Sequence, residues 1–275
     1  MQSPPAPSPQ PITALAITAL VLAGSRPGRD PLAEAAGVAT KALAPVAGRP
    51  MIDHVARVLA DHPRIGRVVL LAQQPEMLTD HPQTRWLRDH EKVELAVSGT
   101  GISQSLLDWI GADGAMLPAL VTTADNVLID AETIDAFLAG VGGADIAAAM
   151  VERRVLMRAY PESRRTWLRF RGGAYSGANL FWLGSARAAR VLAKWREIEQ
   201  DRKKGWKIVS AFGPVLLLGA ALRLLSIHQA IKRAGARLGV DARIVPLPIP
   251  EACIDADKPD DIVLIEHILA ARVRQ

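Results

Sequence analysis

Five charged side chains, far apart in the sequence, are of the types that bind a polyphosphate together with a divalent cation. Asp125, Asp255 and Asp257 offer hard carboxylate oxygens, and Mg2+ needs only one or two such ligands because it keeps water and binds substrate phosphates. Arg29 and Lys41 offer positive charge, which binds phosphate oxygens and neutralises charge that develops on them. These residue types therefore indicate chemistry at phosphorus, with Mg2+ as the cofactor.

The carboxylates also have structural alternatives. Asp125 could cap the turn that follows an apolar run, and Asp257 could cap the last helix, whose dipole Asp260 and Asp261 would then favour. We assign Asp260 and Asp261 to the structural role and Asp125 to the metal. Asp255 and Asp257 remain equal candidates for the second metal ligand.

A loop rich in glycine, serine and proline follows the first apolar run, which covers residues 12–22. Such a loop presents backbone N–H groups to phosphate. Pro27 removes one of these donors, so a neighbouring residue must replace it. The residues that we expect to bind the nucleotide here are Ala23, Gly24, Ser25 and Gly28.

These candidates need a scaffold, and the apolar pattern predicts one. Short apolar runs at Arg67–Ala72, Val93–Val97, Ala119–Thr123 and Asp145–Met150 read as buried strands, and Met51–Ala60 reads as an amphipathic helix between them. Alternating strands and helices predict an α/β fold with a mostly parallel, Rossmann-like sheet flanked by helices. Ligands of such sheets bind beyond the carboxyl ends of the strands, where Gly24 and Asp125 lie.

Composition narrows the class further. The chain has 275 residues, 49% of them hydrophobic and 22% charged, which is typical of a globular protein. A single cysteine excludes an internal disulfide and a cysteine metal cluster and favours a reducing, cytoplasmic location. Aromatic residues make up only 4%, and no nucleic-acid-binding motif is present, so nucleic acid is not an expected partner. Residues 1–11 carry five prolines and predict a disordered leader before one domain at 12–275.

The positive charge is concentrated in the second half. Residues 153–207 hold 15 Lys and Arg against 4 Asp and Glu, a balance that attracts phosphorylated ligands or anionic lipid. Most of the arginines between Arg153 and Arg171 are expected to be solvated surface. Beyond them, Ala186–Gln200 and Val215–Ala234 predict helices in a basic insertion at 185–240.

That insertion has two interpretations. The apolar stretch 215–234 contains Arg223, Lys232 and Arg233 and so does not span a bilayer. It is either a buried core helix, which we prefer, or a surface that touches anionic membrane beside the basic, tryptophan-bearing loop 201–207. The second interpretation would place the protein at the inner face of the membrane.

Residues 20–51 resemble the opening of the nucleotidyltransferases with a glycosyltransferase-A-like fold. That group includes the molybdenum-cofactor cytidylyl- and guanylyltransferases and the sugar-phosphate nucleotidyltransferases. Its pattern is a strand, a glycine loop ending in arginine, and a lysine that leads into Leu-x-Pro-Val-x-Gly-x-Pro-Met. The matching residues are Leu22, Ala23, Gly24, Arg29, Lys41, Leu43, Pro45, Val46, Gly48, Pro50 and Met51.

The resemblance continues in the same order along the chain. It implies that Gly99 and Thr100 contact the nucleoside and that Asp125 binds magnesium. The acidic segment 254–262 is similar to the element that completes the metal site. The segment 173–181 is similar to the one lining the acceptor pocket, which makes Gly177 and Asn179 candidate acceptor contacts.

Residues and resemblance together predict an enzyme that moves a nucleoside monophosphate from a triphosphate, with CTP favoured, to a phosphorylated acceptor and releases pyrophosphate. The acceptor is a sugar, an alcohol or lipid headgroup, or a cofactor phosphate. One alternative is a glycosyltransferase of the same fold that uses Asp255-Ala256-Asp257 as its metal motif. Another is a non-catalytic sensor or scaffold, which Ser25 and Pro27 favour because they replace family glycines. The oligomeric state stays open.

Overall fold

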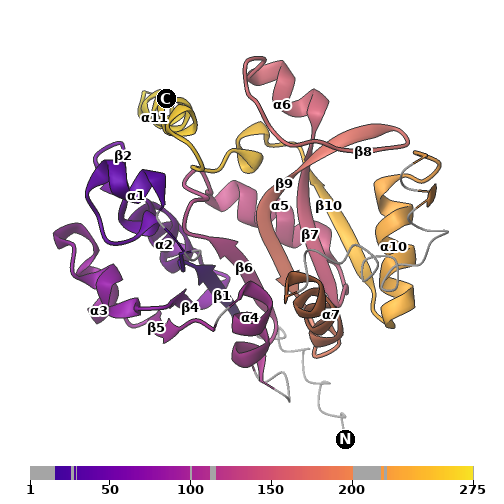
Figure 1. Cartoon of the computed structure of the whole chain (residues 1–275), viewed down its shortest axis with the longest axis horizontal. Coiled ribbons are helices and arrows are strands. Elements are labelled where there is room, and N and C mark those ends of the chain that lie inside the picture. The colour runs from indigo at the N-terminus through magenta and orange to yellow at the C-terminus, as the bar shows by residue number, and fades with distance from the viewer. Residues whose placement is uncertain are drawn as a thin grey trace, which may run out of the picture.

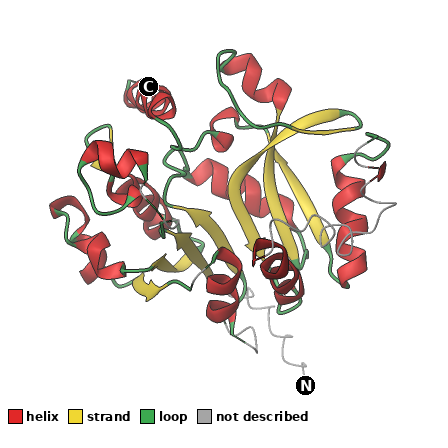
Figure 2. Cartoon of the chain, viewed as in Figure 1, coloured by secondary structure: helices red, strands yellow, loops and turns green. Residues whose placement is uncertain are grey.

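An eight-stranded sheet forms the centre of the protein (Figures 1 and 2). The computed structural model describes residues 16–25, 28, 30–99, 101–111, 116–200, 218–219 and 222–274. The strand order is β10-β7-β9-β6-β1-β4-β5, and β8 pairs with β9. The strands are β1 (Ile17–Leu22), β4 (Ile65–Ala72), β5 (Val93–Val97), β6 (Ala119–Thr123), β7 (Ile146–Glu152), β8 (Leu168–Phe170), β9 (Gly173–Leu183) and β10 (Ala242–Leu247).

The sheet is mostly parallel, as predicted. β1 runs parallel to β4 and β6, β4 to β5, and β10 to β7, whereas β9 is antiparallel to β6, β7 and β8. The four strands predicted from apolar runs are present, with bounds that differ by two residues or fewer. The carboxyl ends of β1, β4 and β6 therefore lie at one edge of the sheet.

Helices cover both faces of the sheet. Successive residues of a strand point to opposite sides, so a strand with apolar residues throughout must be covered on both. In β1, Ala19 and Val21 join one core cluster and Leu20 joins the other. The helices are α1 (Pro31–Ala36), α2 (Met51–Asp61), α3 (Trp86–Asp89), α4 (Ile102–Ile110), α5 (Ala131–Val141), α6 (Arg153–Ala159), α7 (Ala188–Gln200), α10 (Ile227–Leu238) and α11 (Pro259–Val273). α2, α5 and α11 pack on the first face, and α4 and α7 pack on the second.

Shorter elements complete the chain. β2 (Pro45–Val46) and β3 (Arg49–Pro50) form a separate two-stranded sheet. The 3-10 helices are η1 (Lys41–Leu43), η2 (Pro75–Thr79), η3 (Pro82–Thr84) and η4 (Pro250–Cys253). η1 and η4 matter most for function, since each leads into or carries a predicted site residue.

The prediction of one continuous helix over 215–234 was wrong. Arg223 has a left-handed backbone with φ 55°, which interrupts a helix. α10 begins only at Ile227, after Ser226 caps it and exchanges hydrogen bonds with Gln229 in a capping box. The predicted membrane-contacting loop 201–207 lies outside the described residues. Within the part of the chain that is described, no helix is both long and apolar enough to cross a membrane.

β9 contains an irregularity that affects the site. Against β7, Phe181 pairs with Ala148 while Gly177 pairs with Met150, so β9 carries extra residues between them. Asn179 sits in this bulge with φ 46°, a left-handed conformation that asparagine tolerates better than most residues. Its carbonyl oxygen accepts a hydrogen bond from Thr122 Oγ1 at 2.9 Å. The bulge thus turns the Asn179 side chain out of the regular alternation.

A buried carboxylate, Asp53, anchors the start of α2. Its oxygens accept hydrogen bonds from Trp86 Nε1 (2.6 Å), Arg49 Nε (2.7 Å) and Arg57 Nε (3.0 Å). Burial by itself would raise the pKa of this carboxyl, but the three donors outweigh burial and hold the pKa below its ordinary value. Asp53 therefore favours the folded state when it is charged.

We expect Asp53→Asn to destabilise the protein at neutral pH, because hydrogen bonds to a charged group each contribute about 1.5 to 3 kcal/mol. A group whose folded pKa is depressed stabilises above its unfolded pKa of about 4, and that contribution disappears as the pH falls through the folded pKa. Urea unfolding should therefore separate variant and wild type at pH 7 and much less near about pH 3. The control is Asp61→Asn, an exposed carboxyl at the end of the same helix. An equal loss in both variants would contradict the assignment.

Candidate active site

Lys41 joins two of the three predicted metal-binding carboxylates. Its Nζ lies 2.6 Å from Asp125 Oδ2 and 2.7 Å from Asp257 Oδ1. These residues are separated by 84 and 216 positions in the chain, so only the tertiary fold can bring them together. The structure therefore brings Lys41, Asp125 and the acidic segment together, while the chemical roles predicted for them stay predictions.

Local structure explains each position. Lys41 opens η1, which Thr40 caps by accepting from Ala42 N. Asp125 follows the carboxyl end of β6, and Thr123 Oγ1 donates to its Oδ1 at 2.5 Å. The backbone N–H of Ala256 donates to the Asp125 carbonyl oxygen at 3.0 Å. That last bond ties the acidic C-terminal loop directly to the end of β6.

The charge of Lys41 is held firmly. Burial lowers the pKa of this ammonium, but the carboxylates of Asp125 and Asp257 raise it more, and the net shift is upward. Lys41 is therefore a permanent cation at neutral pH. It neutralises part of the negative charge that the two carboxylates concentrate at this edge of the sheet.

Asp255 has different partners from Asp257. Arg165 Nη1 donates to Asp255 Oδ1 at 2.6 Å, and Asn179 Nδ2 donates to Asp255 Oδ2 at 2.7 Å. Burial raises the pKa of the Asp255 carboxyl, while Arg165 opposes that shift. Both carboxylate oxygens are thus engaged by side chains from the 153–183 region. Of the two candidates for the second ligand, Asp257 is the one that faces the same cation as Asp125.

The pair Asp125 and Asp257 fits the needs of a divalent cation. Mg2+ requires one or two carboxylates when substrate phosphates and water supply the remaining ligands, and these two already converge on one positive group. Among the described residues, no group of three or more His, Cys, Asp or Glu side chains is arranged to hold a metal. A metal site here would therefore depend on the phosphates of a bound nucleotide.

A pocket of about 540 Å3 lies beside the carboxyl ends of β1 and β4. Three of the predicted nucleotide-binding residues line it. Ser25 N donates to Gln73 Oε1 at 2.9 Å and Gln73 Nε2 donates to the Ser25 carbonyl at 3.0 Å, which fixes the loop after β1. The full lining consists of Ala23, Ser25, Ala39, Thr40, Ala72, Gln73, Gln74, Met77, Ser98 and Gly99.

Of the remaining residues predicted to bind the nucleotide, the structure describes Gly24 and Gly28 and leaves out Thr100. A Cβ on Gly24 would lie 2.9 Å from Gln73 Nε2, so this position requires a glycine or a shift of the Gln73 side chain. Gly28 is exposed, with φ 111°. Arg29 and Thr100 lie outside the described residues, as does Pro27. Their predicted roles stay predictions.

The two predicted acceptor residues differ in their surroundings. Gly177 is exposed, and a Cβ added there would meet no atom within 4 Å. Asn179 contacts Asp255 and so belongs to the polar network around the acidic loop. The residue in the capping position of α11 is Lys258 and not Asp257. The Asp261 side chain accepts from the N–H groups of Asp257 (3.3 Å) and Lys258 (3.0 Å), which fits the structural role assigned to Asp261.

Two contributors were missed from the sequence. Arg165 was grouped with solvated arginines, yet its side chain is only 9% exposed and is paired with Asp255. Gln73 was not considered, although it clamps the loop after β1. A polar residue directly after the β4 strand was a usable signal for Gln73, because ligands bind at that edge. No sequence signal distinguishes Arg165 from its neighbours.

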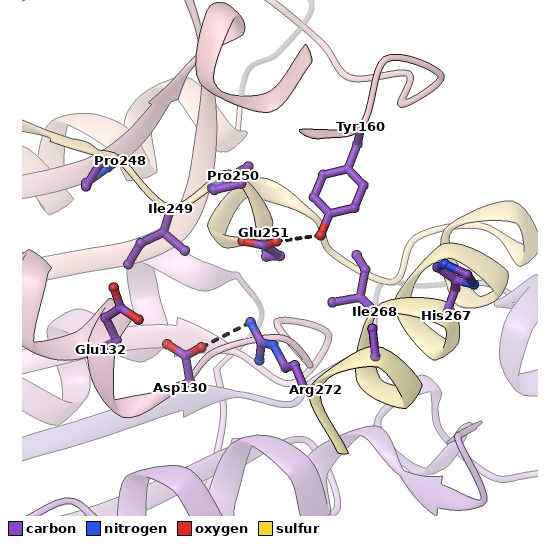
Figure 3. A pocket seen from close by; sticks show the side chains of 11 residues that line it. Asp130, Glu132, Tyr160, Pro248, Ile249, Pro250, Glu251, His267, Ile268 and Arg272 are labelled. Carbon is purple, nitrogen blue, oxygen red and sulfur yellow. Dashed lines mark hydrogen bonds and ion pairs between the residues drawn. The ribbon is translucent and has the colours of Figure 1, made fainter. Parts of the chain in front are cut away.

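A second pocket, of about 610 Å3, lies between η4 and the end of α11 (Figure 3). None of the predicted site residues lines it. Two contacts join side chains of its lining: Tyr160 donates to Glu251 at 2.5 Å, and Arg272 lies 3.0 Å from Asp130.

Comparisons with known proteins agree with this geometry. A model of the MobA-like NTP transferase domain matches residues 19–216. A solved structure described as a hypothetical transferase from Thermus thermophilus is 26% identical and has a TM-score of 0.72, with coverage of 90% of this chain and all of that one. A comparison with curated proteins gave no significant match.

Two more distant structures share the fold. The 4-diphosphocytidyl-2C-methyl-D-erythritol synthase of Anaerococcus prevotii is 10% identical, with a TM-score of 0.55, 92% of this chain covered and 96% of that one. A CMP:2-keto-3-deoxy-manno-octonic acid synthetase in complex with CTP is 11% identical, with a TM-score of 0.56, 93% of this chain covered and 99% of that one.

The fold is that of the nucleotidyltransferases with a glycosyltransferase-A-like fold. Because the family model covers more than half of the chain, the protein belongs to the MobA-like NTP transferase family. The enzyme class predicted from the sequence is thereby confirmed.

We expect Lys41→Met to tighten the binding of Mn2+, used as a probe for the divalent cation, in the absence of nucleotide. The ammonium contacts one oxygen of each carboxylate that we propose for the metal, and its removal takes away this competing cation. We expect the Mn2+ affinity to rise about tenfold, which corresponds to roughly 1.4 kcal/mol. This is a modest part of the interaction between the ammonium and the two carboxylates. Electron paramagnetic resonance of free Mn2+ measures the affinity.

Lys258→Met is the matched control for that prediction. It removes an exposed lysine next to Asp257 in sequence and lowers the local positive charge by the same amount. We expect a much smaller gain, because exposed charges are screened by salt. Equal gains in the two variants would show that Lys41 acts only through general electrostatics.

Proposed function

We propose that this nucleotidyltransferase uses Mg2+ to move a nucleoside monophosphate from a triphosphate to a phosphorylated small molecule, with release of pyrophosphate. The observation that carries the proposal is the position of Lys41 between Asp125 and Asp257. A lysine beside two carboxylates at the carboxyl edge of the sheet can bind phosphate while the carboxylates hold a cation.

In the proposed reaction, an oxygen of the acceptor phosphate attacks the α-phosphorus in line. The bond from that oxygen to the α-phosphorus forms, the bond to the bridging oxygen breaks, and pyrophosphate leaves with the electron pair. No covalent enzyme intermediate is needed. Catalysis then depends on alignment, which supplies about 7 to 11 kcal/mol in favourable cases, and on charge neutralisation.

Each described residue has a task in this scheme. Lys41 would leave one carboxylate and bind the triphosphate, while Asp125 and Asp257 would hold Mg2+. The metal, when bound, would neutralise phosphate charge and orient the leaving pyrophosphate. Arg29 is expected to assist Lys41 because of its match to the family pattern.

The pocket between β1 and β4 is the proposed nucleoside site. Its lining includes Ala23, Ser25 and Gly99, and the loop is held in place by Gln73. The small residues Ala23, Ser25 and Gly99 leave room for a phosphate to approach the main chain at this end of the pocket. CTP is the triphosphate that we expect to bind best, on the sequence resemblance to the molybdenum-cofactor branch.

The acceptor is proposed to bind near Asn179 and Gly177. The bulge in β9 turns Asn179 toward Asp255, next to the cation site. The acceptor class is a sugar phosphate, a phosphorylated alcohol or lipid headgroup, or a cofactor phosphate. Contact with an anionic membrane would favour the lipid headgroup, and flotation with anionic liposomes at low salt tests it.

The alternatives gain less support. For a glycosyltransferase, Asp255 and Asp257 would act as one Asp-x-Asp pair, yet Asp255 binds Arg165 and Asn179 while Asp257 binds Lys41. For a non-catalytic sensor, Ser25 would impair the phosphate loop. The Ser25 backbone N–H donates to Gln73 Oε1 at 2.9 Å, and Pro27 lies outside the described residues, so turnover measurements decide between the sensor and the enzyme.

A thermal-shift screen of the four triphosphates with Mg2+ should identify the preferred nucleotide, since a ligand that binds only the folded state raises the melting temperature. Pyrophosphate release with a set of phosphorylated acceptors then tests turnover. Release of pyrophosphate from a triphosphate, with no sugar nucleotide present, distinguishes a nucleotidyltransferase from a glycosyltransferase, because a glycosyltransferase needs the sugar nucleotide as its donor. Binding without release over the whole acceptor set would support the sensor.

We expect Lys41→Ala to lower turnover at least about tenfold, because the loss of a hydrogen bond to a charged group costs roughly 1.5 to 3 kcal/mol. The fold should persist, since the side chain is at the edge of the sheet and not in the core. Lys232→Ala, at an exposed position of α10, is the control and should keep full activity. Full activity of the Lys41 variant would remove Lys41 from the mechanism.

A further inference from the structure

Arg165 stands apart from the arginines around it. The neighbouring arginines are exposed, namely Arg153, Arg154, Arg158, Arg164, Arg169 and Arg171. The Arg165 side chain is 9% exposed. It comes from the segment between α6 and β8, within the long connection from β7 to β9. An arginine is rarely buried unless its charge is paired, so its partners indicate its role.

Those partners are concentrated on one short stretch. Nη1 donates to Asp255 Oδ1 at 2.6 Å, and Nη2 donates to the Asp255 carbonyl oxygen at 3.1 Å. Nη1 also lies 3.7 Å from Asp261 Oδ1. A planar guanidinium that holds both a side chain and the backbone of one residue fixes its orientation as well as its charge.

The same stretch is held on its other side. Asn179, in the left-handed bulge of β9, donates to the second oxygen of Asp255 at 2.7 Å. Asp261 accepts from the backbone N–H of Asp257 and Lys258. Asp257, two residues after Asp255, therefore reaches Lys41 from a loop whose conformation is fixed at several points.

One donor of Arg165 is left over. Its Nε is buried and has no hydrogen-bond partner among the described residues. A buried arginine with a purely structural role normally has its donors paired, because an unpaired buried donor costs free energy. The position of the Arg165 side chain therefore satisfies its two hydrogen bonds to Asp255 and leaves the Nε donor unpaired.

We propose that Arg165 is a positioning residue that fixes Asp255 and thereby holds Asp257 against Lys41 and Asp125. It couples the segment between β7 and β9, where the acceptor is proposed to bind, to the cation site. The backbone bond from Ala256 to Asp125 transmits the constraint, since any shift of Asp255 pulls on it. The inference rests on the proposed function, because the consequence for turnover assumes the reaction given above.

The test compares Arg165→Met with Arg164→Met, its exposed neighbour. For Arg165→Met we expect Mn2+ affinity to fall about tenfold or more, as for other residues that orient metal ligands. kcat should fall by a similar or larger factor of about ten to a hundred, because small misplacements of reacting groups are costly. Binding of the triphosphate without metal should change less than about twofold. Arg164→Met should match wild type in all three measurements.

A double variant separates positioning from charge balance. Arg165→Met leaves Asp255 buried without its cation, and adding Asp255→Asn removes that unpaired charge and should restore thermal stability. If Arg165 positions the loop, kcat and Mn2+ affinity stay low in the double variant. Recovery of both, or a single variant that loses neither, would overturn the proposal. Arg165→Lys, which keeps the charge but not the two-pronged grip, should fall between wild type and Arg165→Met.

The result stays informative if the proposed reaction is wrong. Mn2+ affinity and triphosphate binding are equilibrium measurements that need no acceptor. Absence of pyrophosphate release in wild type would refute the proposed function alone. Unchanged Mn2+ affinity in Arg165→Met, with wild type active, would refute the positioning role alone.

Discussion

The arrangement of the candidate site depends on one electrostatic requirement, which is that the carboxylates gathered at the edge of the sheet be neutralised. Asp125 ends β6 and Asp257 comes from the C-terminal loop, and Lys41 lies between them. Without a cation, the two carboxylates would repel each other at close range. The same concentration of negative charge makes the edge suitable for a divalent ion and its phosphates. The same charged atoms of Lys41, Asp125 and Asp257 therefore carry both the structural role and the proposed chemical role.

Different features lie on the two sides of the Lys41 contacts. The β1, β4 and β5 side offers a pocket lined by several small residues together with Gln73, Gln74 and Met77, and Gln73 holds Ser25 after the end of β1. The β7, β9 and α6 side offers a polar network of Arg165, Asn179 and Asp255. The antiparallel strand β9 lies between β6 and β7. It brings the second half of the chain next to the end of β6.

Much of the fold and part of the site could be predicted from the sequence. The apolar runs that became β4 and β6 are continuous because these strands are buried on both faces, and the runs that became β5 and β7 were also apolar enough to predict strands. Asp125 was found from its place after a buried strand, and Lys41 from its charge and from the resemblance to the nucleotidyltransferase pattern. The break before α10 could not be predicted from apolarity alone, because a capping box at Ser226 and a left-handed Arg223 override the helical pattern. The bulge at Asn179 depends on pairing with two different strands.

The sequence by itself determined which chemistry is available and which edge of the sheet carries it, because strand order along the chain and residue type are local properties. Only the tertiary structure decided that Asp257 meets Lys41 while Asp255, two residues earlier, meets Arg165. It also decided which one of seven nearby arginines is buried. These choices depend on hydrogen bonds between segments about 90 or more residues apart. Such contacts form only once the chain is folded, since closing long loops costs entropy that packing must offset.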